Sequence, residues 1–132
     1  MADHQVNLRQ GTIHYRDTGS GESIVFVHGL LVNGTLWRKV VPLLEGRFRC
    51  IVPDWPLGAH PEGMPASADL TPPALASLIN DFLAALDLQQ VTLVGNDTGG
   101  ALCQIVATEH PDRLARLVLT PADAFKNFLP PM

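Results

Sequence analysis

The sequence predicts a three-layer α/β/α domain on a mostly parallel sheet, with about six strands and about three helices. Short apolar runs alternate along the chain with segments in which apolar residues recur at helical spacing. This alternation is typical of parallel strands that are joined by helices. The 132 residues are 46% apolar and 17% charged, which is the composition of one globular domain.

The strands are expected where apolar residues form short runs. Residues 6–16 alternate apolar and polar side chains around Gly11, which predicts an antiparallel hairpin at one edge of the sheet. Nearly continuous apolar runs predict strands that are covered on both faces, at residues 24–27, 49–52, 91–94 and 117–119.

Three segments have the spacing of helices. Residues 36–44 place apolar side chains, Leu43 among them, on one side of an expected helix that Gly46 ends. A second helix is expected from the N-cap Thr71 to about residue 88. A third runs from about residue 98 to 110, where Pro111 stops it. The Pro-, Gly- and Ala-rich stretch 54–70 is expected to form a surface loop.

Charge and cysteine content argue against several classes of protein. The net charge is −4 and the nine Lys and Arg are scattered, unlike the clustered cations of a nucleic-acid-binding surface. No signal peptide is visible, and no apolar run approaches the ~20 residues of a membrane-spanning helix. Cys50 and Cys103 are expected to be buried free thiols, which suits a reducing cytosol. We therefore expect a cytoplasmic protein with no metal, cofactor, nucleic-acid or membrane partner.

The segment that carries chemistry is the hexapeptide at residues 95–100, between an expected strand and an expected helix. A residue at such a junction projects over the carboxyl edge of the sheet, where α/β proteins place nucleophiles. Gly95 and Gly99 stand two positions on either side of Asp97, where a sharp turn leaves no room for side chains. The amino end of the helix favours the ionised carboxylate that a nucleophilic aspartate requires.

Two other interpretations of this aspartate are open. Asp97 is also a suitable N-cap for the helix that follows it. The triplets Asp-Thr-Gly at residues 17–19 and 97–99 match those that aspartic proteases pair, so that two carboxylates share a proton. That fold is almost entirely β, whereas this chain is expected to contain helices.

The chain resembles the α/β-hydrolase superfamily, and within it the branch of haloalkane dehalogenases and epoxide hydrolases. Besides the Asp97 turn, the matching pieces occur in the family's order: YRDTGSG at 15–21, VFVHG at 25–29, LWR at 36–38, RCIVPD at 49–54 and HPDRL at 110–114. The resemblance covers essentially the whole chain.

The resemblance implies a site and a mechanism. Asp97 would attack an electrophilic carbon of a small apolar substrate, displacing a halide or opening an epoxide, to form an alkyl-enzyme ester. Water activated by a histidine would hydrolyse the ester, while the backbone N–H groups of Leu30 and Thr98 form the oxyanion hole. His28 would be a structural residue beside that hole.

The choice between halide and epoxide chemistry stays open. Dehalogenases usually place Trp after the nucleophile and often Asn after His-Gly as halide donors, whereas this sequence has Thr98 and Leu30. Trp37 and Trp55 are expected to pack in the core. Epoxide hydrolases use tyrosines of a cap domain, and the one tyrosine here, Tyr15, falls in an expected edge strand.

The length predicts that residues 1–132 are the N-terminal half of the core domain, with the cap and C-terminal strands absent from this chain. His110, the only histidine after Asp97, would lie about 20 Å from it along one helix. Asp123 follows the last strand and is the tentative catalytic acid, or otherwise a solvated loop carboxylate. The alternative to an Asp-nucleophile hydrolase is a non-catalytic half-domain. In either case the apolar edge at 117–119 predicts self-association or a complementing segment.

Overall fold

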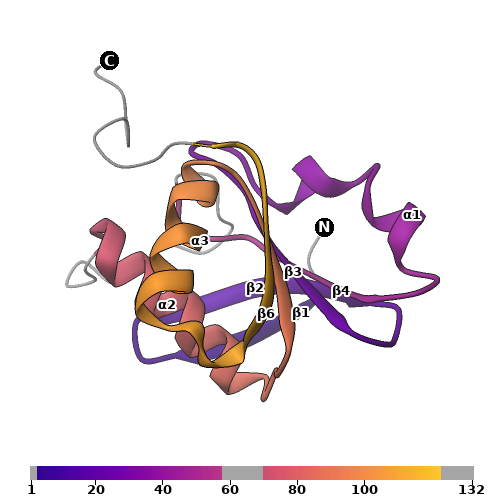
Figure 1. Ribbon diagram of the computed structural model, residues 1–132, viewed down its shortest axis with the longest axis horizontal. Coiled ribbons are helices and arrows are strands. Elements are labelled where there is room, and N and C mark those ends of the chain that lie inside the picture. The colour runs from indigo at the N-terminus through magenta and orange to yellow at the C-terminus, as the bar shows by residue number, and fades with distance from the viewer. Residues whose placement is uncertain (1–2, 58–69, 123–132) are drawn as a thin grey trace.

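A six-stranded sheet forms the centre of the computed structural model, which describes residues 3–57 and 70–122. Its strands follow the order β1-β2-β4-β3-β5-β6 (Figure 1). Their bounds are β1 (His4–Leu8), β2 (Gly11–Thr18), β3 (Ser23–Val27), β4 (Arg49–Pro53), β5 (Val91–Asp97) and β6 (Leu114–Ala122).

The sheet is mostly parallel, as predicted. Strands β4, β3, β5 and β6 run parallel to one another, while β2 is antiparallel to β4. Strands β1 and β2 form the predicted antiparallel hairpin, with Val6 opposite Ile13. The central strand β3 is buried along its whole length, which explains why its sequence is a continuous apolar run.

Helices cover both faces of the sheet and complete the three layers (Figure 1). Helices α2 (Pro72–Ala85) and α3 (Thr98–Glu109) lie on one face, and the short segments η1 (Gly34–Trp37) and α1 (Val41–Leu44) on the other. A further 3₁₀ turn, η2 (Pro111–Arg113), leads into β6. Alternate residues of β3 serve the two cores: Val25 and Val27 pack in the cluster beneath α2 and α3, and Ile24 and Phe26 in the cluster beneath η1.

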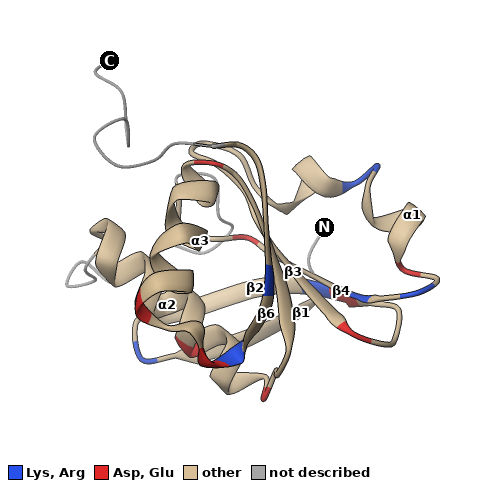
Figure 2. Ribbon diagram, viewed as in Figure 1, with Lys and Arg blue, Asp and Glu red and all other residues tan. Residues whose placement is uncertain are grey.

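Charged residues are spread over the molecule, and both signs are interspersed in Figure 2. The shortest ion pair among the described residues joins Arg49 to Asp17 through two hydrogen bonds, of 2.7 and 3.0 Å. Cys50 and Cys103 are free and buried, as predicted. None of the helices in the described part of the chain is long and apolar enough to cross a membrane.

The expected helix at residues 36–44 is wrong. The structure has two short pieces instead, η1 and α1, with Pro42 in the first turn of α1. Proline has no N–H, and its ring clashes with the carbonyl four residues earlier, so one continuous helix cannot pass through it. As a result Leu43, expected on the buried side, is 82% exposed. Of the other two expected helices, α3 matches its expected span to within one residue, and α2 ends three residues earlier than expected.

We predict that Phe82→Ala lowers the free energy of unfolding by about 3–5 kcal/mol, because Phe82 is fully buried between Tyr15 and Trp55. The matched control Leu43→Ala removes an exposed side chain and should change it by less than about 0.5 kcal/mol. Urea denaturation followed by circular dichroism measures both. A large loss for Leu43→Ala would mean that residues 36–44 do form a packed helix.

Candidate active site

The turn at Asp97 is the sharp strand-to-helix junction that the sequence predicted. Strand β5 ends at Asp97 and helix α3 begins at the next residue, Thr98. Asp97 has φ 56° and ψ −129°, a conformation that costs a non-glycine residue on the order of 1–3 kcal/mol. Its side chain is exposed, whereas the three residues that follow it are buried. The backbone therefore presents the carboxylate outward at the carboxyl end of the sheet.

Gly95 and Gly99 allow this turn because neighbouring atoms fill the space that a side chain would need. A Cβ on Gly99 would lie 2.3 Å from the carbonyl oxygens of both Val27 and His28. A Cβ on Gly95 would lie 2.7 Å from the Cα of Gly100 and 2.8 Å from the Sγ of Cys103. Contacts this short exclude any side chain. The start of α3 thus rests directly on the end of β3.

The loop after β3 brings Gly29 against the aspartate. A Cβ on Gly29 would lie 2.8 Å from the Cβ of Asp97 and 3.0 Å from its Oδ2. The backbone nitrogen of Leu30 is only two covalent bonds from the Cα of Gly29, so it lies beside the carboxylate. The Leu30 N–H donates no hydrogen bond to any of the described residues. The structure therefore brings together Asp97, Leu30 and Thr98, which sequence reasoning had placed in one site.

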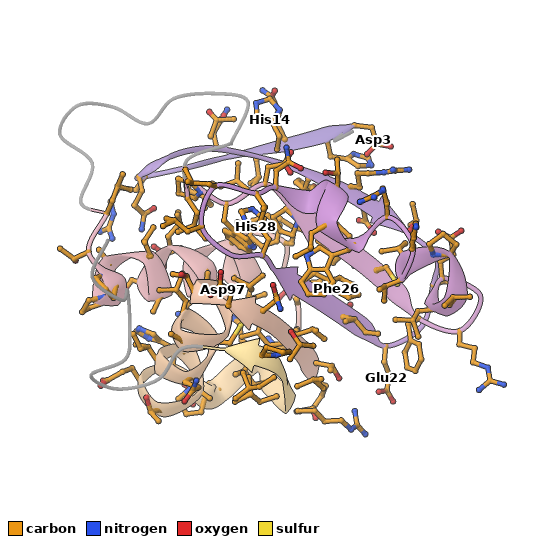
Figure 3. The ribbon with its side chains drawn as sticks, turned by 90° about the horizontal axis from the view of Figure 1, so that it is seen from above. Asp3, His14, Glu22, Phe26, His28 and Asp97 are labelled. Atoms are coloured by element: carbon orange, nitrogen blue, oxygen red, sulfur yellow. The ribbon has the colours of Figure 1, made fainter. Side chains whose placement is uncertain are left out.

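His28 is fully buried and is held at both ring nitrogens. Its Nε2 accepts a hydrogen bond from the backbone N–H of Trp55 at 2.8 Å. The proton must then reside on Nδ1, which donates to the carbonyl oxygen of Gly29 at 2.9 Å. Figure 3 labels His28 and Asp97 in a view onto this end of the sheet. With both nitrogens engaged, His28 does not have the free acceptor that a general base needs.

Asn96 and Thr120 tie the turn to β6, and neither was singled out from the sequence. The side-chain amide of Asn96 donates to the Thr120 hydroxyl at 2.8 Å, and that hydroxyl donates to the Gly95 carbonyl at 3.1 Å. The β5–β6 register shifts between Gly95 and Asp97 at this point. An amide next to Asp97 and a hydroxyl in an apolar strand are weak signals, because both residue types are common on surfaces.

Two alternative interpretations of Asp97 do not fit the geometry. Its side chain makes no capping hydrogen bond to α3, so it does not stabilise the start of this helix as an N-cap side chain would. Asp17 is on β2, with β4 and β3 between it and β5, and Arg49 binds its carboxylate. Thr18 pairs with Cys50 near the start of β4, whereas Asp97 lies at the carboxyl end of the sheet. The two Asp-Thr-Gly triplets therefore cannot share a proton.

The remaining candidates lie away from the turn. His110 follows α3 at the end opposite Asp97, about 20 Å along the helix, and contacts the Ser77 hydroxyl at 3.5 Å. Trp37 and Trp55 are buried in the two cores, as expected. Asp123, the tentative acid, lies outside the described residues.

Comparison with known proteins agrees with this geometry. The family model described as alpha/beta hydrolase fold matches residues 22–131. The chain belongs to the α/β-hydrolase family. Haloalkane dehalogenase 2 of Mycobacterium tuberculosis is 34% identical over 113 residues, which are 83% of this chain and 38% of that protein.

Solved structures of hydrolases superpose on most of this α/β-hydrolase chain. A meta-cleavage product hydrolase from Pseudomonas fluorescens IP01 has a TM-score of 0.85 at 25% identity, over 95% of this chain and 47% of its own. The epoxide hydrolase CorEH has a TM-score of 0.77 at 26% identity, over 91% of this chain and 42% of its own. This chain spans less than half the length of each of these three proteins.

We predict that Gly99→Ala lowers the free energy of unfolding by about 3 kcal/mol, because the new methyl group would collide with two backbone carbonyls that cannot move independently. Gly46→Ala is the matched control, because a Cβ there meets nothing within 4 Å. The Gly46→Ala substitution should leave the free energy of unfolding unchanged or raise it slightly. If denaturation midpoints show that the two variants are equally stable, α3 does not rest on the end of β3 as described.

Proposed function

We propose that this α/β-hydrolase chain carries an Asp nucleophile, Asp97, which forms an alkyl-enzyme ester with a haloalkane- or epoxide-type substrate. The observation that carries the proposal is the strained, exposed conformation of Asp97 directly against Gly29. Strain of this kind persists only where surrounding contacts enforce it, and it concentrates at functional sites. The 34% identical relative named haloalkane dehalogenase 2 supports the same chemistry.

The substrate class follows from the chemistry of a carboxylate. Attack on an ester would produce a reactive anhydride, whereas attack on a saturated carbon produces a stable ester. With a haloalkane, the Asp97 oxygen forms a bond to carbon while the carbon–halogen bond breaks and halide leaves. With an epoxide, a ring C–O bond breaks instead, and the alkoxide oxygen takes a proton from solvent water. Water then splits either ester into the alcohol or diol and the free carboxylate.

The oxyanion site serves the second of these steps. Addition of water to the Asp97 ester places negative charge on a carboxyl oxygen of Asp97 itself. We assign its stabilisation to the backbone N–H groups of Leu30 and Thr98, because these two peptides flank the carboxylate. Since both donors are backbone groups, Leu and Thr serve here as well as other side chains would. The same two residues lack the usual side-chain halide donors, so the leaving group would need another binding partner.

Two functions must come from outside the described part of this chain. No described histidine is free beside Asp97 to activate water, since His28 is engaged and His110 is remote. Asp97 is also exposed, whereas displacement at carbon is favoured in a site from which water is excluded. We therefore propose that the activity of the whole protein depends on a base and a cover supplied by a further segment.

We predict that this chain alone is alkylated once at Asp97 and does not turn over, because no histidine of the described residues is free to reach the ester. Intact-mass and peptide mass spectrometry after incubation with a bromoalkane should show one added alkyl group on the peptide that contains Asp97. An epoxide should instead add its full mass. The bromoalkane and the epoxide are compared side by side, because the reagent that modifies Asp97 identifies the substrate class.

Asp97→Asn is the control for this experiment, because it keeps the shape of the side chain and removes the nucleophile. The adduct should fall to the background set by other carboxylates. An equal adduct on Asp97→Asn would show that another residue reacts. Sustained release of product by the 132-residue chain would show that a base does reach the ester.

We also propose that the β6 edge is covered in the working protein, by a complementing segment or by a second copy. In the described part of the chain β6 pairs only with β5, and Leu117, Val118 and Leu119 are 37–44% exposed. An edge strand with exposed apolar side chains is a template for pairing with another strand. A chain that requires such a partner corresponds to the alternative function, a half-domain that is not catalytic by itself.

We predict that the isolated chain self-associates at micromolar concentration and that Val118→Lys reduces the association, because a charged side chain on an edge strand opposes pairing. Leu43→Lys is the control, because Leu43 is exposed on the distant α1. Sedimentation velocity compares the three proteins. A stable monomer of the unchanged chain would overturn the proposed covering of this edge.

A further inference from the structure

A pocket of about 140 Å³ lies on the face of the sheet that η1 and α1 cover (Figure 1). Its volume is close to the roughly 150 Å³ of a cavity that can hold a benzene molecule. The sheet contributes Arg16 and Thr18 of β2 and Val52 of β4, which pairs with Arg16. Because side chains alternate between the two faces of a strand, Arg16 and Thr18 lie on the same side. Asp97 is not among the lining residues.

Two polar atoms of lining residues are buried without a hydrogen-bond partner among the described residues. They are the indole Nε1 of Trp37 and the hydroxyl oxygen of Thr18. Trp37 is 6% exposed, and its ring packs against Phe26 with the ring centroids 5.0 Å apart, so the direction of its N–H is fixed. An indole N–H can only donate, and native proteins rarely leave buried polar groups unpaired. The two atoms therefore point to a ligand that accepts hydrogen bonds.

The charges around the pocket favour an anion. Arg16 is exposed and makes no hydrogen bond or ion pair with any described residue, so its guanidinium is available to a ligand. Arg38 lines the pocket from the end of η1, and one of its N–H groups donates to the Thr35 carbonyl at 3.1 Å. Two arginines and one glutamate, Glu45, line the pocket, so its net side-chain charge is +1. This charge matches a monoanion, whereas Glu45 would repel a dianion more strongly.

We propose that this pocket binds a small monocarboxylate with a short apolar chain of about four carbons, the size that its volume admits. The carboxylate accepts hydrogen bonds from Trp37 Nε1 and the Thr18 hydroxyl and faces the guanidinium of Arg16. Its apolar chain lies against Val41 and Pro42, which line the pocket from α1. This site is separate from the proposed alkyl-enzyme chemistry, so either can fail without the other.

The two tryptophans provide the probe and its internal control. Sodium butyrate is titrated into the ¹⁵N-labelled 132-residue chain, and NMR follows the two indole N–H signals, which are assigned through contacts with neighbouring protons. The Trp37 signal should shift saturably, with a dissociation constant on the order of millimolar. The Trp55 signal should stay, because its indole N–H already donates to the Phe26 carbonyl at 2.9 Å. No saturable shift of Trp37 at about 50 mM butyrate, or an equal shift of Trp55, would overturn the proposal.

Two variants test the role of the arginine. Arg16→Gln should weaken butyrate binding about fivefold or more, because it removes the charged donor that faces the carboxylate. Arg116→Gln is the matched control, because Arg116 is an exposed arginine on β6, at the other side of the sheet from β2, where it pairs with Glu22. It removes the same charge and should change the affinity by less than about twofold. Both side chains are exposed, so both variants should fold. An equal loss of affinity in the two variants would overturn the site.

Two further compounds define the class of ligand. Butanol has the apolar chain without the charge, and sulfate has the charge without the chain. At the concentration that half-saturates the pocket with butyrate, and at equal ionic strength, neither should shift the Trp37 signal. An equal shift with butanol would show an apolar pocket without selectivity for an anion, and an equal shift with sulfate would show an unspecific anion site. Either result would overturn the assignment to a carboxylate, and neither bears on the alkylation of Asp97.

Discussion

The contact between the start of α3 and the end of β3 is the constraint on which the rest of the site depends. Gly99 lies so close to the carbonyls of Val27 and His28 that no side chain fits between them. This approach places the Asp97 turn against the loop at Gly29. It also places the carboxylate beside the peptide that leads to Leu30. If α3 were displaced by the width of a methyl group, the Asp97 carboxylate would move away from the Gly29–Leu30 peptide.

The site is anchored from three directions by hydrogen bonds between buried or partly buried groups. The segment after β3 contributes His28, the segment after β4 contributes Trp55, and β6 contributes Thr120 through its bonds to Asn96 and Gly95. The interior of a sheet resists deformation, because each strand is bonded to its neighbours. Such rigidity explains how a strained φ at Asp97 persists, and it allows backbone N–H groups to serve as fixed donors.

The same architecture is open at two places in the described part of the chain. The carboxyl edge of the sheet is open at Asp97, and β6 has one paired and one unpaired edge in the described residues. Related hydrolases are more than twice as long as this chain. Asp97, the peptides at Leu30 and Thr98 and the groups that hold them form one coherent unit. Under the proposed function, water activation and exclusion of solvent require residues that reach over this edge.

The sequence by itself determined the sheet, the hairpin, α2, α3 and the position of the Asp97 turn. These features depend on local patterns, namely apolar runs, turn glycines and stop signals, which act within a few residues. The expected helix at 36–44 failed because Pro42 outweighs its apolar spacing. Only the tertiary structure decided which nitrogen of His28 donates, that Trp55 holds it, and that Asn96 reaches Thr120. Those contacts join residues 24 to 27 positions apart, and their hydrogen-bond directions are set only once the strands are aligned.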